Sequence, residues 1–413
     1  MNHIRNRRIG VWIFFLIASI SARAELVTFQ KAASGSPVKI ICFGDSVTGL
    51  YYHTGGRRTY TDLLGDALRR AIPNAKVEMR NAGSSGHTTV NALGRIERDV
   101  IAHKPELVTV MFGLNDMVRV PLDAYRANLV MIVEKCRAAG AEVVLCTPNA
   151  ITDNTARPTK KLLEYCAAVR SVAAEFKVPL CDAYSDFDAL RKRDYLKWRL
   201  LMSDDIHPNL AGHQFIAERI ASVIAAKPVD LENLVVPSPA IPRTIALRKS
   251  KKPIQVLAMP PFDKWIVAPL AQGEASPKPK VISWDVVGKT LPQIEQDASG
   301  RVRKLKPNLV IIAVPRSAAA KSVEEFIHAH TWIANWSLSF GRQEWDCVIV
   351  HPSVADPEGV DPEKDDLIRK LAIAADLALI DRKPGDQSSA EELFTNWLRA
   401  ELGIGHRGRS PSQ

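Results

Sequence analysis

Short apolar runs alternate with amphipathic helical segments through the first half of the chain, and this alternation strongly restricts the fold. Continuous apolar runs are typical of strands buried in a parallel sheet. Strands that alternate with helices predict a parallel, doubly wound α/β domain. The apolar spacing of Leu93, Ile96 and Val100 predicts one helix over residues 90–103. The predicted strands cover residues 40–43, 77–80, 107–112, 143–146 and 179–182.

Polar residues follow three of these strands directly. The sequence Gly-Asp-Ser (44–46) follows the first strand, NAGSSGHTT (81–89) follows the second, and FGLND (112–116) ends the third. A fourth polar segment, DDIHPN (204–209), precedes the predicted last helix of this half, 209–226. Parallel sheets bind ligands at the carboxyl ends of their strands. We therefore expect the four segments to meet at one edge of the sheet.

Three residues in these segments have the chemistry of nucleophilic catalysis. The hydroxyl of Ser46 needs a base before it can attack, and His207 is the candidate base. Asp204 lies three residues before His207, so its carboxylate can accept a hydrogen bond from the imidazole and stabilise the imidazolium. The sequence therefore predicts attack by Ser46 with His207 and Asp204 as its partners.

The negative charge that develops on an attacked carbonyl needs preorganised donors. The candidate donors are the backbone N–H of Ser46, the backbone N–H of Gly86 and the side-chain amide of Asn115. Asp45 and Asp116 are better interpreted as residues that hold their loops by accepting backbone hydrogen bonds.

With these motifs in place, residues 36–226 resemble the SGNH hydrolases, also called the GDSL esterase/lipase family. The resemblance implies a flavodoxin-like three-layer α/β/α sandwich, with Ser46 as nucleophile, His207 as base and Asp204 as its partner. It also implies an oxyanion hole made by Ser46, Gly86 and Asn115, and we expect neither a metal nor a cofactor. The matching positions are Gly44, Asp45 and Ser46 (block I), Gly86 (block II), Gly113, Asn115 and Asp116 (block III), and Asp204 and His207 (block V).

Five segments of the chain are predicted to have separate roles. Residues 1–24 have a basic start, an apolar run and a small-x-small ending at Ala24, as expected of a signal peptide for export to the periplasm or the medium. An uncleaved anchor helix is the alternative. The remaining segments are an esterase domain (25–226), a proline-rich linker (227–252), a second α/β domain (253–404) and a disordered tail (405–413).

The second half has weak echoes of the first, spaced by about 200 residues. KPNLVIIAV (306–314) resembles KPELVTVMF (104–112), and CVIVHP (347–352) resembles VVLCTP (143–148). We interpret the second half as a degenerate copy of the same fold. It has no Gly-Asp-Ser, no Asn-Asp after its third strand and no Asp-x-x-His, so we expect it to be non-catalytic.

Charge and cysteine content exclude some classes of function. Cleavage after Ala24 removes four arginines and lowers the formal net charge from +10 to +6, which is mild for a chain of this size. No basic run has interleaved aromatic residues, so nucleic-acid binding is not supported. The six cysteines show no Cys-x-x-Cys pair or metal-ligand spacing, and most fall in apolar runs where cysteine acts as a small core residue. A disulfide between Cys136 and Cys166 stays open.

The sequence therefore predicts a secreted serine ester hydrolase that acts through an acyl-enzyme on a small-molecule or polysaccharide ester. A carbohydrate O-acetylesterase is preferred, and a lipid esterase, lysophospholipase or thioesterase is the alternative. The loop 50–58, with its tyrosines and arginines, is predicted at the rim, as a sugar or anion contact or as an ordinary polar loop. A rival function is carbohydrate binding without catalysis through tryptophans of the second domain: Trp265, Trp284, Trp332, Trp336 and Trp345.

Overall fold

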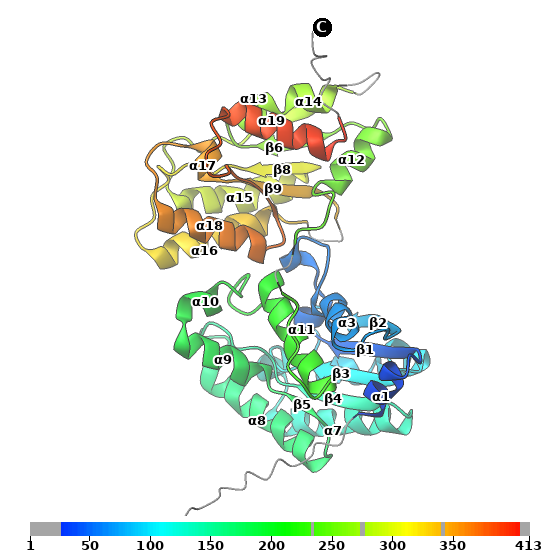
Figure 1. Cartoon of the computed structure of the whole chain (residues 1–413). Helices are drawn as coiled ribbons and strands as arrows, with labels where there is room; N and C mark the ends of the chain where they lie inside the picture. Colours follow the sequence, from blue (N-terminus) through cyan, green and yellow to red (C-terminus); the bar gives the residue numbers. More distant parts are fainter. Residues whose placement is uncertain (1–25, 233–234, 273–276, 340–342, 405–413) are drawn as a thin grey trace, which may run out of the picture.

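The computed structural model describes residues 26–404, apart from 233–234, 273–276 and 340–342. It contains two five-stranded parallel sheets, each flanked by helices (Figure 1). The first unit consists of the β1–β5 sheet with α1–α11, and the second unit consists of the β6–β10 sheet with α12–α19. The predicted three-layer α/β/α fold and the second α/β region are confirmed. The predicted signal peptide (1–24) and tail (405–413) lie outside the described residues.

The sheet of the first unit has the order β2-β1-β3-β4-β5. Every residue of β3 is buried, as expected of a central strand covered on both faces. The strands are β1 (Val38–Gly44), β2 (Val77–Gly83), β3 (Leu107–Met111), β4 (Glu142–Cys146) and β5 (Leu180–Cys181).

The helices of the first unit begin at recognisable caps. Thr59 and Asp62 form a capping box at the start of α3, and the Asn209 side chain accepts from the Gly212 N–H at the start of α11. The helices are α1 (Val27–Ala33), α2 (Ser46–Gly49), η1 (Tyr52–Thr54), α3 (Tyr60–Ala71), α4 (Thr89–Leu93), α5 (Ile96–Asp99), η2 (Ile101–His103), α6 (Asp116–Arg119), α7 (Leu122–Ala138), α8 (Thr159–Glu175), α9 (Ala183–Arg193), α10 (Tyr195–Arg199) and α11 (Leu210–Ile224).

The single helix predicted over residues 90–103 is wrong, because the segment is broken into α4, α5 and η2. Arg95 stands between the first two pieces and is buried. Its guanidinium donates to the carbonyls of Ala82 and Gly44, at 2.6 and 2.8 Å, and lies 4.5 Å from the centre of the Phe43 ring. These contacts bond the carbonyls where β1 and β2 end, and they draw the backbone away from helical geometry.

The second unit repeats the arrangement, with the sheet order β7-β6-β8-β9-β10. Its strands are β6 (Gln255–Ala258), β7 (Lys280–Ser283), β8 (Leu309–Ile312), β9 (Asp346–Val350) and β10 (Ala378–Ile380). Its helices are α12 (Pro242–Lys249), α13 (Phe262–Trp265), α14 (Val267–Ala271), α15 (Leu291–Leu305), α16 (Val323–Ser337), α17 (Pro352–Ala355), α18 (Pro362–Ala374) and α19 (Ala390–Glu401).

The two sheets match in detail as well as in order. The echoes 306–314 and 347–352 fall on β8 and β9, which occupy the places of β3 and β4. Arg170 donates to Asp182 just after β5, at 2.8 Å, and Arg369 donates to Asp381 just after β10, at 2.6 Å. The recurrence of this ion pair supports the interpretation of the second unit as a copy of the first.

One part of the range expected to be a linker (227–252) is ordered. Residues Pro242–Lys249 form α12, and Ile241 and Leu247 belong to the second hydrophobic core. The N–H and hydroxyl of Thr244 both donate to Asp346 at the start of β9, at 2.7 Å each. The proline content indicated a chain break, but Pro242 instead begins this helix, where its missing N–H has no cost.

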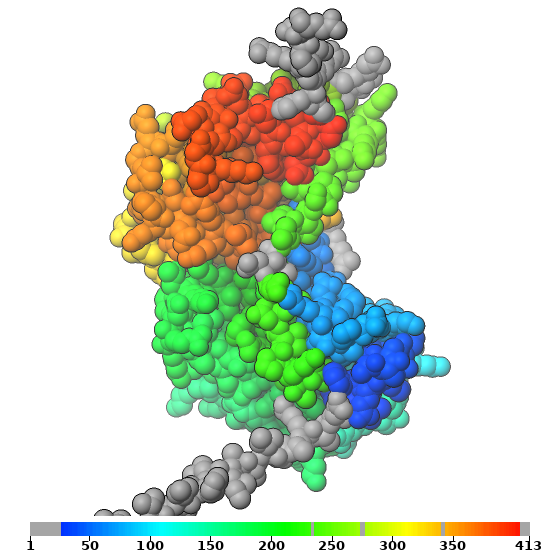
Figure 2. Space-filling view, in the orientation of Figure 1, coloured from blue at the N-terminus to red at the C-terminus, as the bar shows by residue number. Residues whose placement is uncertain are grey.

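The two units touch directly. Figure 2 shows the green surface of the first unit against the yellow and orange surface of the second.

All six cysteines are free and buried, Cys136 and Cys166 included. Within the described part of the chain, no helix has both the length and the apolar character needed to cross a bilayer.

Candidate functional site

Ser46 lies at the carboxyl end of β1, as the first residue of α2. The Val47 N–H donates to the Asp45 carboxylate at 3.0 Å, which caps this short helix. A Cβ on Gly44 would lie 2.6 Å from the Met111 carbonyl oxygen, so only glycine fits where β1 ends. The sharp exit from the strand places Ser46 at the edge of the sheet, with 7% of its surface exposed.

A hydrogen-bonded chain joins Ser46 to residues that are remote in sequence. Ser46 Oγ lies 2.9 Å from His207 Nε2, and His207 Nδ1 lies 2.8 Å from Asp204 Oδ2. The other oxygen of Asp204 accepts from the N–H groups of Ile206 and His207, at 2.8 and 2.7 Å. The Asp204 turn therefore holds its own carboxylate and the imidazole in one geometry, and the structure brings the three predicted residues together.

The pKa values of Asp204 and Asp45, two carboxyl groups near Ser46, are shifted in opposite directions. Burial acts to raise the pKa of Asp204, but its hydrogen bond to His207 and the charge of His207 outweigh burial and hold this pKa below its usual value. Burial raises the pKa of Asp45 to about 7. Asp204 is therefore an anion at neutral pH, as an imidazolium partner requires.

Two of the three predicted oxyanion donors, Gly86 and Asn115, lie on adjoining loops. Asn115 Nδ2 donates to the carbonyl oxygen of His87 at 3.1 Å, which links the 112–116 loop to the 81–89 loop. Gly86 has a φ of +73°, a left-handed conformation that favours glycine. Asp116 Oδ1 accepts from the Thr89 N–H and hydroxyl, at 2.8 and 2.6 Å. Asp116 therefore holds the two loops together.

Gly113 allows the third strand to turn into this site. Its φ is +141°, and a Cβ there would lie 3.2 Å from both the Pro148 ring and the Tyr125 hydroxyl. Any other residue would be strained and crowded at this position.

The sequence placed His53 only in the rim loop 50–58 and did not predict its contact with His207. His53 is buried, its ring stacks on the ring of His207 with 4.3 Å between centroids, and its Nδ1 lies 2.9 Å from Ser203 Oγ. Burial lowers the pKa of His53 well below its ordinary value. No local motif contains His53, because its partners lie about 150 residues further along the chain.

Among the residues that the structure describes, His53, Asp204 and His207 form a group that could hold a metal ion, since their ligand atoms lie within 4.8 Å of one another. The two rings are stacked with only 18° between their planes. Their nitrogen lone pairs therefore lie in nearly parallel planes and do not converge on one point, as metal ligands must. The arrangement fits proton transfer better than metal binding.

The loop 50–58 is not a free rim. Arg58 pairs with Asp376 of the second unit at 2.8 Å, and Arg57 donates to the carbonyls of Pro237 and Ala240. The Tyr52 hydroxyl donates to a carbonyl of α16 at 2.7 Å. The expectation that these side chains contact sugars or anions is replaced by a role in fastening the two units.

The tryptophans of the second unit do not form an exposed sugar platform. Trp284 and Trp345 are buried, and the other four (Trp265, Trp332, Trp336 and Trp397) are half-buried. Their placement favours a packing role.

We expect His213 of α11 to make the first unit sensitive to acid. The ring is buried, its Nδ1 accepts from the Tyr60 N–H at 3.1 Å, and burial lowers its pKa to about 3. Between about pH 6.5 and pH 3 the unfolded chain binds a proton there and the native chain does not, so this residue reduces stability as pH falls. His213→Gln lacks this dependence. Urea unfolding gives the free energy of unfolding of each protein. The value for wild type minus the value for His213→Gln should be about 2 kcal/mol lower at pH 5 than at pH 7. If the two free energies change with pH in parallel, this account is wrong.

Comparison with known proteins places the first unit among ester hydrolases. Residues 42–215 match the GDSL-like lipase/acylhydrolase family. An acetylxylan esterase of Geobacillus stearothermophilus is 29% identical over 208 residues, covering 44% of this chain and 92% of that protein. An arylesterase of Vibrio mimicus is 32% identical over 192 residues (46% and 90%). Thioesterase 1/protease 1/lysophospholipase L1 of Escherichia coli K12 is 28% identical over 197 residues (48% and 86%).

Proposed function

The chain belongs to the GDSL-like lipase/acylhydrolase family and is a serine carboxylic ester hydrolase, and from this premise we propose that it removes acetyl groups from carbohydrate through an acyl-enzyme on Ser46. The observation that carries the catalytic assignment is the chain of 2.9 and 2.8 Å contacts from Ser46 through His207 to Asp204. The similarity to an acetylxylan esterase supports the choice of acetyl ester. The small exposed fractions of Ser46 and Asn115, 7% and 6%, favour a small acyl group over a long one.

In the proposed reaction, His207 Nε2 takes the proton of the Ser46 hydroxyl as Oγ attacks the ester carbonyl. The oxyanion of the tetrahedral intermediate is stabilised by the N–H groups of Ser46 and Gly86 and by the Asn115 amide. His207 then gives its proton to the leaving alcohol, and the acyl group stays on Ser46. Water, deprotonated by His207, attacks this ester, releases the acid and restores the serine. Asp204 remains an anion throughout and stabilises the imidazolium.

Substrate choice is tested with esters of increasing acyl length. Purified protein would be assayed with p-nitrophenyl acetate, butyrate and palmitate and with acetylated xylo-oligosaccharides, and Ser46→Ala would serve as the blank. We expect kcat/KM to be highest for acetate, with free acetate released from the oligosaccharide. A preference for palmitate would instead favour the lipid or thioester alternative, to which the thioesterase/lysophospholipase relative points. If the protein hydrolyses none of these esters, the proposal is wrong.

We expect Asn115→Ala to lower kcat by about 10²- to 10³-fold, because the variant loses one oxyanion donor. KM should change little, since the ground-state carbonyl carries little charge. Asn115→Asp has the same shape but places a carboxylate against the oxyanion, so its loss should be at least as large. Steady-state kinetics of both variants check this, and a kcat close to the wild-type value in either would exclude Asn115 from the oxyanion hole.

We propose the domain division and export as follows. Residues 25–226 form the esterase domain, and the second α/β domain, which includes α12 and extends to residue 404, has no catalytic set of its own. Residues 1–24 direct export to the periplasm or the medium. Amino-terminal sequencing of the protein recovered from an exporting host should begin at Glu25, and an intact Met1 would contradict export by cleavage.

A further inference from the structure

One side chain of the second unit is bonded to the turn that carries Asp204 and His207. Asn335 of α16 accepts from the Ser203 hydroxyl through Oδ1, at 2.6 Å, and donates through Nδ2 to the Ser203 carbonyl oxygen. Asn335 and Ser203 are 3% and 2% exposed, so neither bond competes with bulk water. The two bonds fix the orientation of Ser203 relative to α16.

Ser203 contacts both the turn that carries Asp204 and His207 and the ring of His53. Its N–H donates to the His207 carbonyl oxygen at 2.8 Å, and its carboxyl-side neighbour is Asp204. Its hydroxyl also contacts Nδ1 of His53, whose ring covers one face of the His207 ring. A displacement of Ser203 would therefore move both Asp204 and the ring stacked on His207.

The directions of these hydrogen bonds determine the state of His53. Because Asn335 uses its N–H on the Ser203 carbonyl, its Oδ1 faces the Ser203 hydroxyl and receives that proton. Ser203 Oγ must then accept from His53, which carries its proton on Nδ1. Because burial lowers the pKa of His53 and favours the neutral ring, the hydrogen bonds make it the tautomer with its proton on Nδ1. A cation at His53, 3.8 Å from Asp204, would compete for the carboxylate that His207 needs.

The backbone of Asn335 holds the segment that contains His53. Its carbonyl oxygen accepts from the Tyr52 hydroxyl at 2.7 Å and from Arg303 at 2.9 Å. The Arg303 guanidinium also lies 4.8 Å from the centre of the Tyr52 ring. The two segments beside His207, one at Tyr52–His53 and one at Ser203, are thus fastened to the same residue of the second unit.

We infer that Asn335 is a positioning residue for ester hydrolysis, and that the second unit forms part of the working enzyme through this contact. The inference rests on the proposed function of the first unit. It also gives a role to a copy of the fold that has no Gly-Asp-Ser, Asn-Asp or Asp-x-x-His of its own. The second unit supports the His207 turn from outside the esterase fold.

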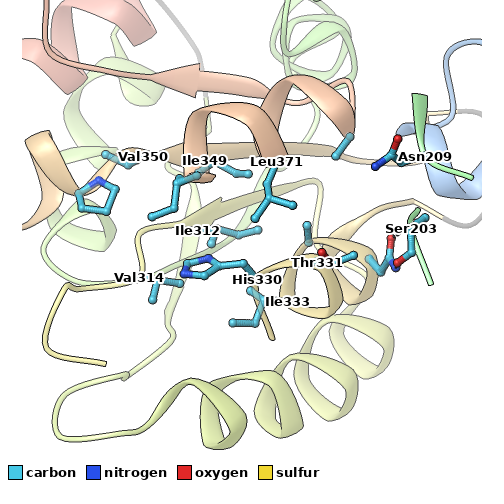
Figure 3. A pocket seen from close by; sticks show the side chains of 15 residues that line it. Ser203, Asn209, Ile312, Val314, His330, Thr331, Ile333, Ile349, Val350 and Leu371 are labelled. Atoms are coloured by element: carbon cyan, nitrogen blue, oxygen red, sulfur yellow. Dashed lines mark hydrogen bonds between the residues drawn. The ribbon is translucent and has the colours of Figure 1, made fainter. Parts of the chain in front are cut away.

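Asn335 lies in an apolar environment that suits a substitution by leucine. Figure 3 shows Ser203 and Asn209 at one end of a small cavity, with Val314 and Val350 toward the other. The cavity has a volume of about 30 Å³ and is lined mainly by apolar side chains from the second unit, Asn335 among its few polar ones. Leucine is close to asparagine in length and would face apolar neighbours there. Asn335→Leu therefore removes the two side-chain hydrogen bonds to Ser203 and keeps the backbone contacts with Tyr52 and Arg303.

The test compares Asn335→Ala and Asn335→Leu with two controls. Thr331→Val alters a buried residue of the same helix and the same cavity, and its hydroxyl has no partner to lose. Glu324→Gln removes the negative charge from another contact between the units, the 3.3 Å pair with Arg199. For each protein we would measure kcat, KM, the thermal midpoint and the low-field proton signal of the His207 Nδ1–H to Asp204 bond.

Both Asn335 variants should lose about 10- to 100-fold in kcat, with KM within about twofold of wild type, because the catalytic groups are misplaced. The low-field signal should broaden or shift in both, and the two controls should keep wild-type kcat and signal. Should Asn335→Ala fail to fold, Asn335→Leu decides. A kcat and a signal equal to those of the controls would overturn the inference. If wild type hydrolyses no ester, the proposed function fails, and the signal alone still decides whether Asn335 positions His207.

Discussion

Ser46→Ala is expected to lower kcat for acetate esters by about 10⁴- to 10⁶-fold, because no other group stands in place of the missing hydroxyl. His207 Nε2 has Ser46 Oγ as its hydrogen-bond partner. Without that oxygen, His207 has no hydroxyl from which to take a proton, and no nucleophile is formed. The fold should be unaffected. The cap of α2 is the hydrogen bond from the Val47 N–H to the Asp45 carboxylate, and this bond does not involve the serine side chain.

The matched control is Ser36→Ala, the same chemical change at an exposed residue just before β1. It should retain full activity, and both variants should have wild-type thermal midpoints. Residual hydrolysis by Ser46→Ala within tenfold of wild type would show that another residue performs the attack, and the proposed mechanism would be wrong.

Asp204→Asn is expected to lower kcat by about 10⁴-fold, although it changes only one oxygen to an NH₂ group. The Ile206 and His207 N–H groups bind Oδ1, so an asparagine would keep its oxygen there and turn its NH₂ toward His207 Nδ1. The ring would then have to accept at Nδ1 and carry its proton on Nε2. In that tautomer it cannot take the proton of Ser46.

Asp205→Asn is the control for this variant, because it makes the same charge change one residue along at an exposed position. Steady-state kinetics should leave it within about twofold of wild type, as is usual for exposed residues that contact nothing at the site. If the two variants lost activity equally, the effect would belong to net charge and the assigned role of Asp204 would be wrong.

The parts of the fold that were predictable from sequence are those set by local pattern. Buried parallel strands are apolar over consecutive residues, so β1, β3 and β4 could be placed from residues 40–43, 107–112 and 143–146. The meeting of Ser46 with the 81–89 and 112–116 loops followed from the rule that the carboxyl ends of parallel strands share one edge. Both inferences depend on periodicity and chain order alone.

Tertiary contacts account for what was missed. Leu93, Ile96 and Val100 have helical spacing, but Arg95 between them bonds carbonyls of β1 and β2 and divides the helix. No sequence window contains both Arg95 and Gly44. Local propensity is overridden in such cases because a buried guanidinium must find acceptors wherever they lie.

The same reason explains why the contact between the units could not be predicted. Asn335 lies 132 residues from Ser203, and the carbonyl of Asn335 lies 283 residues from the Tyr52 side chain that binds it. A lone asparagine in a helix has no motif around it. The tyrosines and arginines of the loop 50–58 suggested a substrate contact. Tyr52 and Arg58 instead bind residues of the second unit, and no local sequence pattern indicates such distant partners.

The central claim, that Ser46 is an activated nucleophile, is tested most directly by covalent trapping. Treatment with a fluorophosphonate should join phosphorus to the serine oxygen, with loss of fluoride and of the hydroxyl proton to His207. Mass spectrometry of the intact protein and of its peptides should find one adduct per chain, on the peptide that contains Ser46, and none in Ser46→Ala. An adduct on a different residue, or ester hydrolysis that continues with Ser46 unlabelled, would contradict the account.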